Sequence, residues 1–309
     1  MNKILSVFSF IVLILIVLYF ALNRKDISVE VAKEVLTNTE SEFITLEGME
    51  VHYRREGSGF PIVLIHGTSA ILQTWNKWTE ELIKNGYEVI RMDLPAFGLT
   101  GSNPDHDYSI PYYVSFIESF TNALGIDSFH LAGNSLGGLI AWEYAVDHQK
   151  NLGKLILVDP AGFKSQNDKK NIFDKLQQYQ FITKPLMTVG TGYLVKQGMK
   201  QSYYSDEKIT DEYYQYYTTA TLREGNRKAF LDRMNVQDEP RIERLKNIQT
   251  PTLIIWGEHD ELIPLMYADS FKAAIPKSKL VVFPDAGHIP MEEIPQQSVQ
   301  DVIQFLKEE

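Results

Sequence analysis

The chain has 309 residues, 44% of them hydrophobic and 23% charged, which is the composition of a globular protein large enough for one α/β domain. Its net charge of −10, without a basic stretch to neutralise phosphates, argues against nucleic acid as a partner. Because the chain has no cysteine, disulfides, a thiolate nucleophile and zinc–thiolate sites are excluded.

The first segment, residues 4–22, is almost wholly apolar. At about 1.5 Å per residue it is just long enough to cross a hydrocarbon core of roughly 30 Å. A cleaved secretory signal is the alternative, although Phe20-Ala21-Leu22 is a poor cleavage site. We predict an uncleaved membrane anchor over residues 1–25 and an extracytoplasmic folded domain, joined by a polar linker over residues 26–42.

From residue 43 onward, short apolar runs alternate with helical patterns. Strands are predicted at residues 43–46, 51–55, 62–66, 87–93, 129–133, 155–159, 252–256 and 280–283. Helices are predicted at residues 71–85, 110–124, 136–148, 265–275 and 297–306. This alternation predicts an α/β fold: a doubly wound, mostly parallel eight-stranded sheet, built from residues 43–163 and 241–309, that binds ligands at the carboxyl ends of its strands.

One interval interrupts the alternation. Between residues 159 and 252 there is no strand pattern, but a polar helical region rich in tyrosine. Its tyrosines include Tyr193, Tyr203, Tyr204, Tyr213, Tyr214, Tyr216 and Tyr217. We predict a helical cap over residues 164–240 that acts as a lid, because it is inserted at the ligand-binding edge. A solvated helical embellishment is the alternative.

Residues 133–137 (Gly-Asn-Ser-Leu-Gly) lie between a predicted strand and a predicted helix. In this context the pattern places Ser135 on a sharp turn, with its hydroxyl exposed beside a helix N-terminus. The flanking glycines keep side chains out of a turn too tight for a Cβ. Ser135 is therefore the candidate nucleophile.

A serine nucleophile needs a base, and the base needs an orienting acid. His288 follows the last predicted strand, at the sheet edge expected for Ser135, and is the candidate base. Asp260 follows the seventh predicted strand and is the candidate acid, with Asp159, at the end of the sixth, as the rival. Other histidines and a neighbouring acid have simpler explanations as strand, loop, surface or core residues: His52, His106, His130, His148, Glu258 and His259.

The third requirement is a pair of donors for a developing oxyanion. His66-Gly67-Thr68-Ser69 follows a strongly apolar predicted strand, so its backbone turns at the same edge. The amides of Thr68 and Leu136 are therefore expected to converge on one point. We interpret His66 as a turn-stabilising residue.

Taken together, these motifs resemble the α/β-hydrolase superfamily from about residue 43 to residue 306. The matching segments are His66-Gly67, residues 93–98 (Asp-Leu-Pro-Ala-Phe-Gly), the turn at Ser135, residues 257–260 (Gly-Glu-His-Asp), and Gly287-His288 with Glu293 and Pro295. The resemblance implies Ser135 as nucleophile, His288 as base, Asp260 as acid and a helical cap over the pocket. One departure is Ala96, where many members carry glycine.

Within the superfamily, the chain resembles bacterial membrane-associated lipases and esterases, and also hydrolases that cleave carbon–carbon bonds in ring-fission products. The second group tends to carry a glycine-rich oxyanion loop, whereas this chain has Thr68-Ser69-Ala70. We therefore expect a serine carboxylesterase or lipase acting on hydrophobic esters, with no metal or organic cofactor. A carbon–carbon hydrolase with the same triad is the alternative, and a non-catalytic receptor or scaffold is a further one.

Overall fold

The computed structural model describes residues 10, 23–163 and 190–308. Eight strands form one sheet in the order β1-β2-β4-β3-β5-β6-β7-β8. Their bounds are β1 Ser41–Leu46, β2 Met49–Gly57, β3 Phe60–Ile65, β4 Tyr87–Met92, β5 Phe129–Asn134, β6 Leu152–Val158, β7 Thr252–Gly257 and β8 Ser278–Phe283. Pairing is antiparallel for β1 with β2 and β2 with β4, and parallel for the rest. The predicted mostly parallel eight-stranded sheet is confirmed.

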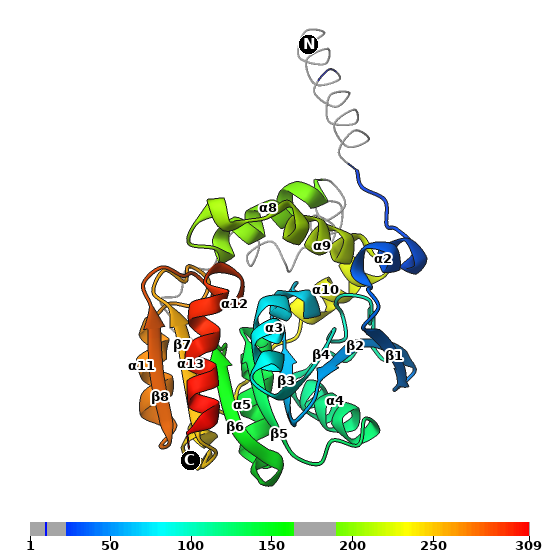
Figure 1. Cartoon of the computed structure of the whole chain (residues 1–309). Coiled ribbons are helices and arrows are strands. Elements are labelled where there is room, and N and C mark those ends of the chain that lie inside the picture. The colour runs from blue at the N-terminus through cyan, green and yellow to red at the C-terminus, as the bar shows by residue number, and fades with distance from the viewer. Residues whose placement is uncertain (1–9, 11–22, 164–189, 309) are drawn as a thin grey trace.

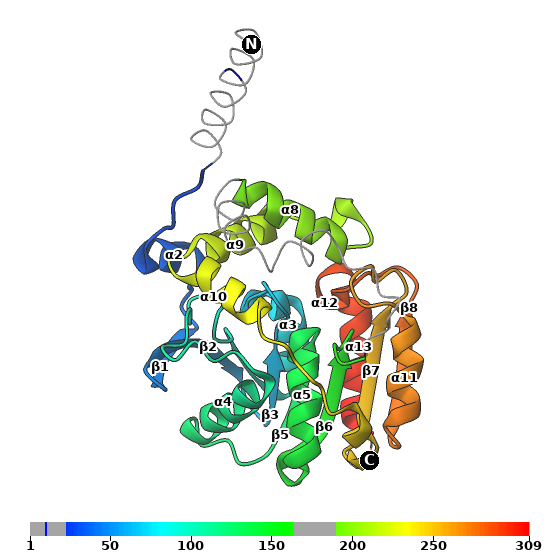
Figure 2. The ribbon, with the colours of Figure 1, turned by 180° about the vertical axis from the view of Figure 1, so that it is seen from behind.

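Helices cover both faces of the sheet (Figures 1 and 2). The helices predicted between the strands are present as η1 Leu72–Trp75 with α3 Asn76–Lys84, α4 Ile110–Ala123, α5 Leu136–Asp147, α11 Met266–Ala274 and α13 Pro295–Lys307. Shorter elements are η2 Gln149–Asn151, η3 Asp206–Lys208, η4 Ile242–Asn247 and α12 Pro290–Glu293. Helices α3 and α13 pack together on one face, while α4 and α5 pack together on the other.

Each helix layer buries its aromatic residues against the sheet. On one face Trp78 of α3 is fully buried, and its indole donates to Ser298 Oγ of α13 at 2.9 Å. On the other face Phe116 of α4, Trp142 of α5 and Phe271 of α11 are equally buried. Two apolar cores therefore hold the sheet rigid, so the loops at its carboxyl edge start from fixed positions.

Among the residues that the structure describes between β6 and β7, three α-helices lie above the carboxyl edge of the sheet (Figure 1). They are α8 Thr191–Ser202, α9 Asp211–Leu222 and α10 Asn226–Met234. This order matches the helical insertion expected from the sequence, although residues 164–189 of the predicted cap lie outside the described residues. We refer to α8, α9 and α10 as the cap helices.

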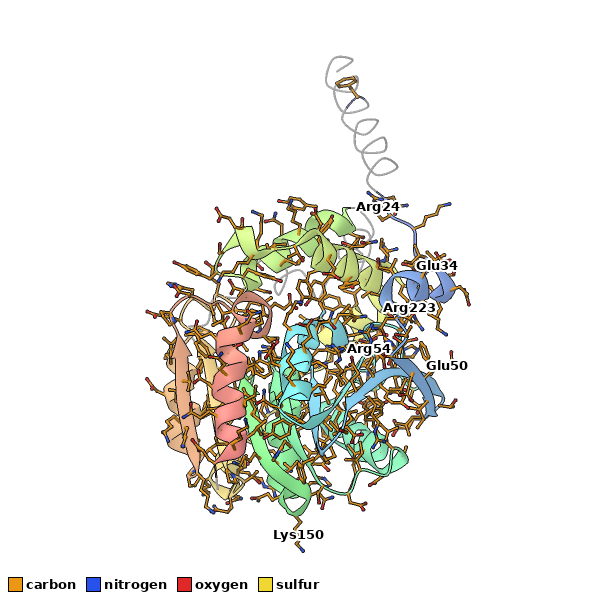
Figure 3. All side chains as sticks on the ribbon, in the orientation of Figure 1. Arg24, Glu34, Glu50, Arg54, Lys150 and Arg223 are labelled. Atoms are coloured by element: carbon orange, nitrogen blue, oxygen red, sulfur yellow. The ribbon has the colours of Figure 1, made fainter. Side chains whose placement is uncertain are left out.

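The segment expected to be a linker is more ordered than a linker. Residues 26–42 hold helix α2 (Val29–Leu36), which packs on α9 with Ala32 and Leu36 buried. Ile27 forms a bridge with Arg223 at the end of α9, near α2 in Figure 3. Lys150, just after α5, lies at the opposite end of the molecule in that view. The sequence of this segment is compatible with a helix, but its one short apolar stripe does not reveal that the helix packs on α9.

The predicted membrane anchor, residues 4–22, lies outside the described residues apart from Phe10. In the part of the chain that the structure describes, no helix combines the length and apolarity that a membrane crossing requires.

Candidate active site

The turn after β5 has the backbone geometry of a nucleophile elbow. Ser135 has φ 55° and ψ −116°, a conformation that a non-glycine residue adopts only under strain. A Cβ added to Gly133 would lie 2.1 Å from Gly137 O, and one added to Gly137 would lie 2.2 Å from Ile65 O. Both flanking positions therefore require glycine, as expected from the sequence.

His288 lies in the loop between β8 and α12, and its ring is held by a carboxylate. His288 Nδ1 is 2.7 Å from Asp260 Oδ2, and both residues are buried. Asp260 is itself oriented by backbone donors, since its Oδ1 accepts from the amides of Leu262 and Ile263 at 2.8 Å each. This arrangement leaves Nε2 as the ring nitrogen available for proton transfer.

Ser135 and His288 line the same cavity, which has a volume of about 520 Å³. The side chain of Asn134 fixes the histidine loop to the elbow, because its Nδ2 donates to His288 O at 3.0 Å and to Val158 O at 3.2 Å. The structure thus places Ser135 and His288 on one cavity and Asp260 against the imidazole of His288. Asn134 is a positioning residue that sequence reasoning missed.

The loop after β3 passes directly over the elbow. A Cβ added to Gly67 would lie 2.9 Å from Ser135 Cβ, and Thr68 lines the cavity beside Ser135. Leu136 is the first residue of α5, where helical N–H groups have no intrahelical partner. His66 stabilises this turn as expected: its Nδ1 is 2.8 Å from Gly67 O, and its Nε2 accepts from Leu94 N at 2.9 Å.

The rival acid, Asp159, takes a different part in the site. Its Oδ1 accepts from Gly257 N at 2.9 Å, and its φ of 44° lies in the left-handed region. Burial, together with the neighbouring Asp260 carboxylate, raises the pKa of Asp159 well above its ordinary value. Asp159 therefore lies beside Asp260 without contacting the imidazole, and the contact with His288 Nδ1 belongs to Asp260.

Among the described residues, one group of side chains has the spacing of metal ligands: Asp159, Asp260 and His288, whose ligand atoms lie within 4.8 Å of one another. The hydrogen bond from His288 to Asp260 uses two of these atoms, and Asp159 Oδ1 already accepts from Gly257 N. The arrangement fits a hydrogen-bonded acid–histidine pair better than a cation site. His259 lies apart, with its ring stacked on Tyr204 at 3.8 Å between centroids.

The cap helices supply most of the apolar wall of the cavity. These side chains are Leu194, Val195, Met199, Ala220, Phe230 and Met234. Among the described residues that line the cavity, Arg227 alone carries a permanent charge, and its guanidinium is 2.6 Å from Asp26 Oδ1. Such a cavity fits an uncharged apolar group better than an anion.

Comparison with known proteins relates this site to others. Residues 61–295 match the family model of the α/β hydrolase fold. The chain is 27% identical over 274 residues to 2-hydroxy-6-oxo-6-(2'-aminophenyl)hexa-2,4-dienoic acid hydrolase from Metapseudomonas resinovorans, covering 85% of this chain and 90% of that protein. It is 28% identical over 260 residues to a monoacylglycerol lipase from Mus musculus, covering 82% and 77%.

A solved bacterial membrane phospholipase A shares the fold, with a TM-score of 0.74 at 22% identity, over 99% of this chain and 98% of that chain. These two sequence relatives are thus a dienoic acid hydrolase and a monoacylglycerol lipase. The matched segment, the sheet and the elbow agree: the chain belongs to the α/β hydrolase fold family.

Proposed function

We propose that the protein is a serine hydrolase of carboxylic esters, a carboxylesterase or lipase. His288 Nε2 takes the proton of the Ser135 hydroxyl as Ser135 Oγ attacks the ester carbonyl. The amides of Thr68 and Leu136 hold the oxyanion. His288 returns the proton to the departing alcohol, and water then releases the acid from Ser135 by the same steps. Asp260 keeps the imidazole in the required tautomer.

The observation that supports this proposal most directly is the joint placement of three groups. Ser135 is on the strained elbow, His288 is on the wall of the same cavity, and Asp260 Oδ2 is 2.7 Å from the far nitrogen of the ring. The four residues at 135, 159, 260 and 288 follow β5, β6, β7 and β8, which are adjacent in the sheet. This is the chemistry-bearing edge that the family uses.

Two features favour esters over ring-fission dienoates. A dienoate substrate carries a carboxylate, which needs a cation when it is buried. The one permanent cation on the described cavity wall, Arg227, is paired with Asp26. In addition, the oxyanion loop reads Thr68-Ser69-Ala70 rather than a run of glycines.

Carbon–carbon hydrolysis with the same residues is the second candidate, favoured by the similarity to the dienoic acid hydrolase. Assaying a vinylogous diketone acid beside a series of short, medium and long acyl esters separates the two functions. The ester proposal expects turnover to be confined to the esters and to rise with acyl length until the cavity is filled.

We further propose that residues 164–240 form a cap that acts as a lid, and that residues 1–25 anchor the protein in a membrane with the catalytic domain outside the cytoplasm. The apolar cap wall described above supports a lipid-like substrate, which an anchored enzyme would meet at a bilayer. The anchor itself rests on the sequence of residues 4–22.

The decisive variant is Ser135→Ala. We expect it to lower kcat by at least about 10³-fold with the fold intact, because no other described side chain on the elbow can attack the carbonyl. The measurement is ester turnover, with labelling of Ser135 by an organophosphonate in the wild-type protein. Near-wild-type turnover in the variant would remove Ser135 from its role.

A further inference from the structure

Two buried acids that the proposed chemistry does not use follow directly behind the candidate base. Glu292 and Glu293 belong to the four-residue helix α12, which begins two residues after His288. Both are less than a tenth exposed. Buried carboxylates are costly unless they are fully hydrogen-bonded, so their partners indicate what they do.

The partners of Glu292 come from three elements that are far apart in sequence. Thr74 of η1 donates to its Oε1 at 2.5 Å. Tyr217 of α9 donates to the same oxygen, and Tyr203, at the end of α8, donates to Oε2. One carboxylate therefore joins the catalytic-histidine segment to the core and to both of these cap helices.

Glu293 makes a second connection through backbone groups. Its Oε1 accepts from the amides of Tyr204 and Ser205 at 3.0 and 3.2 Å, and its Oε2 accepts from Gly287 N at 2.5 Å. His288 N donates in turn to Ser202 O at 2.8 Å. The turn after α8 and the loop that carries His288 are thus joined by the Glu293 carboxyl group and by a direct backbone hydrogen bond.

This connection borders the cavity. Ser202 and Tyr217 line the cavity together with His288 and Ile289. An added Cβ on Gly287 would lie 2.6 Å from Ser202 O, so the cap turn and the histidine loop approach as closely as backbone allows. Neither segment can shift without moving the other, because close-packed interiors transmit small displacements.

We propose that Glu292 and Glu293 are positioning residues that form a clasp between the cap and the histidine loop, so that the acyl-binding wall and the general base are set in place together. The inference rests on the proposed function, since it assigns the clasp a role through His288. Its consequence is that the cap stays fixed at residues 202–205 throughout turnover, and any cap movement takes place elsewhere.

Three variants test the clasp by kinetics: Glu292→Gln, Tyr203→Phe and their combination. Tyr216→Phe is the matched control, because Tyr216 donates to Glu212 on the exposed side of α9. We expect Glu292→Gln and Tyr203→Phe each to lower kcat about tenfold while KM for an acetyl ester changes less than about twofold, since a displaced base impairs chemistry rather than binding. The kcat of the double variant should be no lower than that of the more impaired single variant, because both substitutions remove the same connection. Tyr216→Phe should match the wild type.

A second measurement does not depend on catalysis. Hydrogen exchange at the amides of Gly287, Tyr204 and Ser205 should quicken in Glu293→Gln at least about tenfold, because glutamine offers one acceptor oxygen where Glu293 uses two. If the wild-type protein hydrolyses no ester, the proposed function fails while amide exchange still reports on the clasp. If esters are turned over but folded Glu292→Gln and Tyr203→Phe keep kcat within about twofold of the wild type, the clasp inference is overturned. Should Glu292→Gln fail to fold, the kcat values of Tyr203→Phe and Tyr217→Phe serve as the test, because these variants remove only a hydroxyl. Values within about twofold of the wild type would then overturn the clasp inference.

Discussion

At the scale of single residues, the neighbouring buried acids Asp159 and Asp260 differ in their hydrogen-bond partners. Asp260 accepts from His288 and from two backbone amides, whereas burial and the neighbouring Asp260 raise the pKa of Asp159. We expect Asp260→Asn to lower kcat by roughly 10³- to 10⁴-fold, because an amide at this position reverses the tautomer of the ring. We expect Asp159→Asn to stay within about tenfold of the wild type, because Asp159 does not contact the imidazole and the amide keeps an acceptor for Gly257 N.

Steady-state kinetics on the two variants, with circular dichroism to verify folding, checks this assignment. An Asp159→Asn enzyme as impaired as Asp260→Asn would show that the acid role is shared between the two strands. A nearly unimpaired Asp260→Asn would transfer the role to Asp159.

Glu292 predicts a pH dependence of stability. Burial raises its pKa from the ordinary 4.5 to about 7, against the opposing effect of its hydroxyl donors, and the nearby Glu293 acts in the same direction as burial. Because the folded-state pKa is raised, the stability from this group is fully present below pH 4.5 and is lost as the pH rises through about 7. The loss is on the order of 3 kcal/mol.

Urea unfolding of the wild type and of Glu292→Gln at about pH 5 and about pH 8 measures this effect. The free energy of unfolding of the wild type should fall further between the two pH values than that of the variant, which cannot titrate at this site. Equal pH slopes for the two proteins would contradict the prediction.

At the scale of elements, the turn after β4 carries a strained residue. Ala96 has φ 82°, and its amide donates to Gly101 O at 2.6 Å. Alanine in this region costs energy that glycine does not. We expect Ala96→Gly to raise the free energy of unfolding by about 1 kcal/mol and the melting temperature by roughly 2 to 4 °C, as measured by calorimetry.

The control is Ala273→Gly in α11, an exposed alanine with helical geometry. This change should destabilise by roughly 0.5 to 1 kcal/mol, since glycine weakens a helix. The same sign for both substitutions would mean that strain at residue 96 is not what limits this turn.

The elements show which parts of the fold are readable from sequence. Strands β3 to β8 and the elbow at Ser135 were predictable because apolar runs and glycine requirements are local properties. The connection of Glu292 to Tyr203 and Tyr217 was not, because its members lie 75 to 89 positions apart and meet only when the cap folds over the sheet. The sequence could not decide whether Asp159 or Asp260 contacts His288, because the two acids follow neighbouring strands. Only the side-chain geometry distinguishes them.

At the scale of the whole molecule, the segment before the sheet is part of the folded body. Leu36 is buried, and its carbonyl accepts from Arg54 at 3.2 Å and from Gln73 at 2.7 Å. Deleting residues 1–22 should release the protein from membranes and leave the free energy of unfolding unchanged. Deleting residues 1–37 should lower it by at least about 3 kcal/mol, through lost apolar burial and unpaired buried donors.

Membrane fractionation and urea unfolding of both truncations provide the measurements. A short truncation that remains in the membrane fraction would contradict the anchor prediction. A long truncation as stable as the short one would show that α2 contributes nothing to the fold.

The ion pair between Arg227 and Asp26 has an implication for how relatives diverge. Arg227 borders the cavity, yet Asp26 precedes every residue that the family model matches. Part of the cavity wall is therefore held in place by a segment outside the residues that the family model matches. Changes near Asp26 could thus alter the cavity wall without touching the sheet or the elbow.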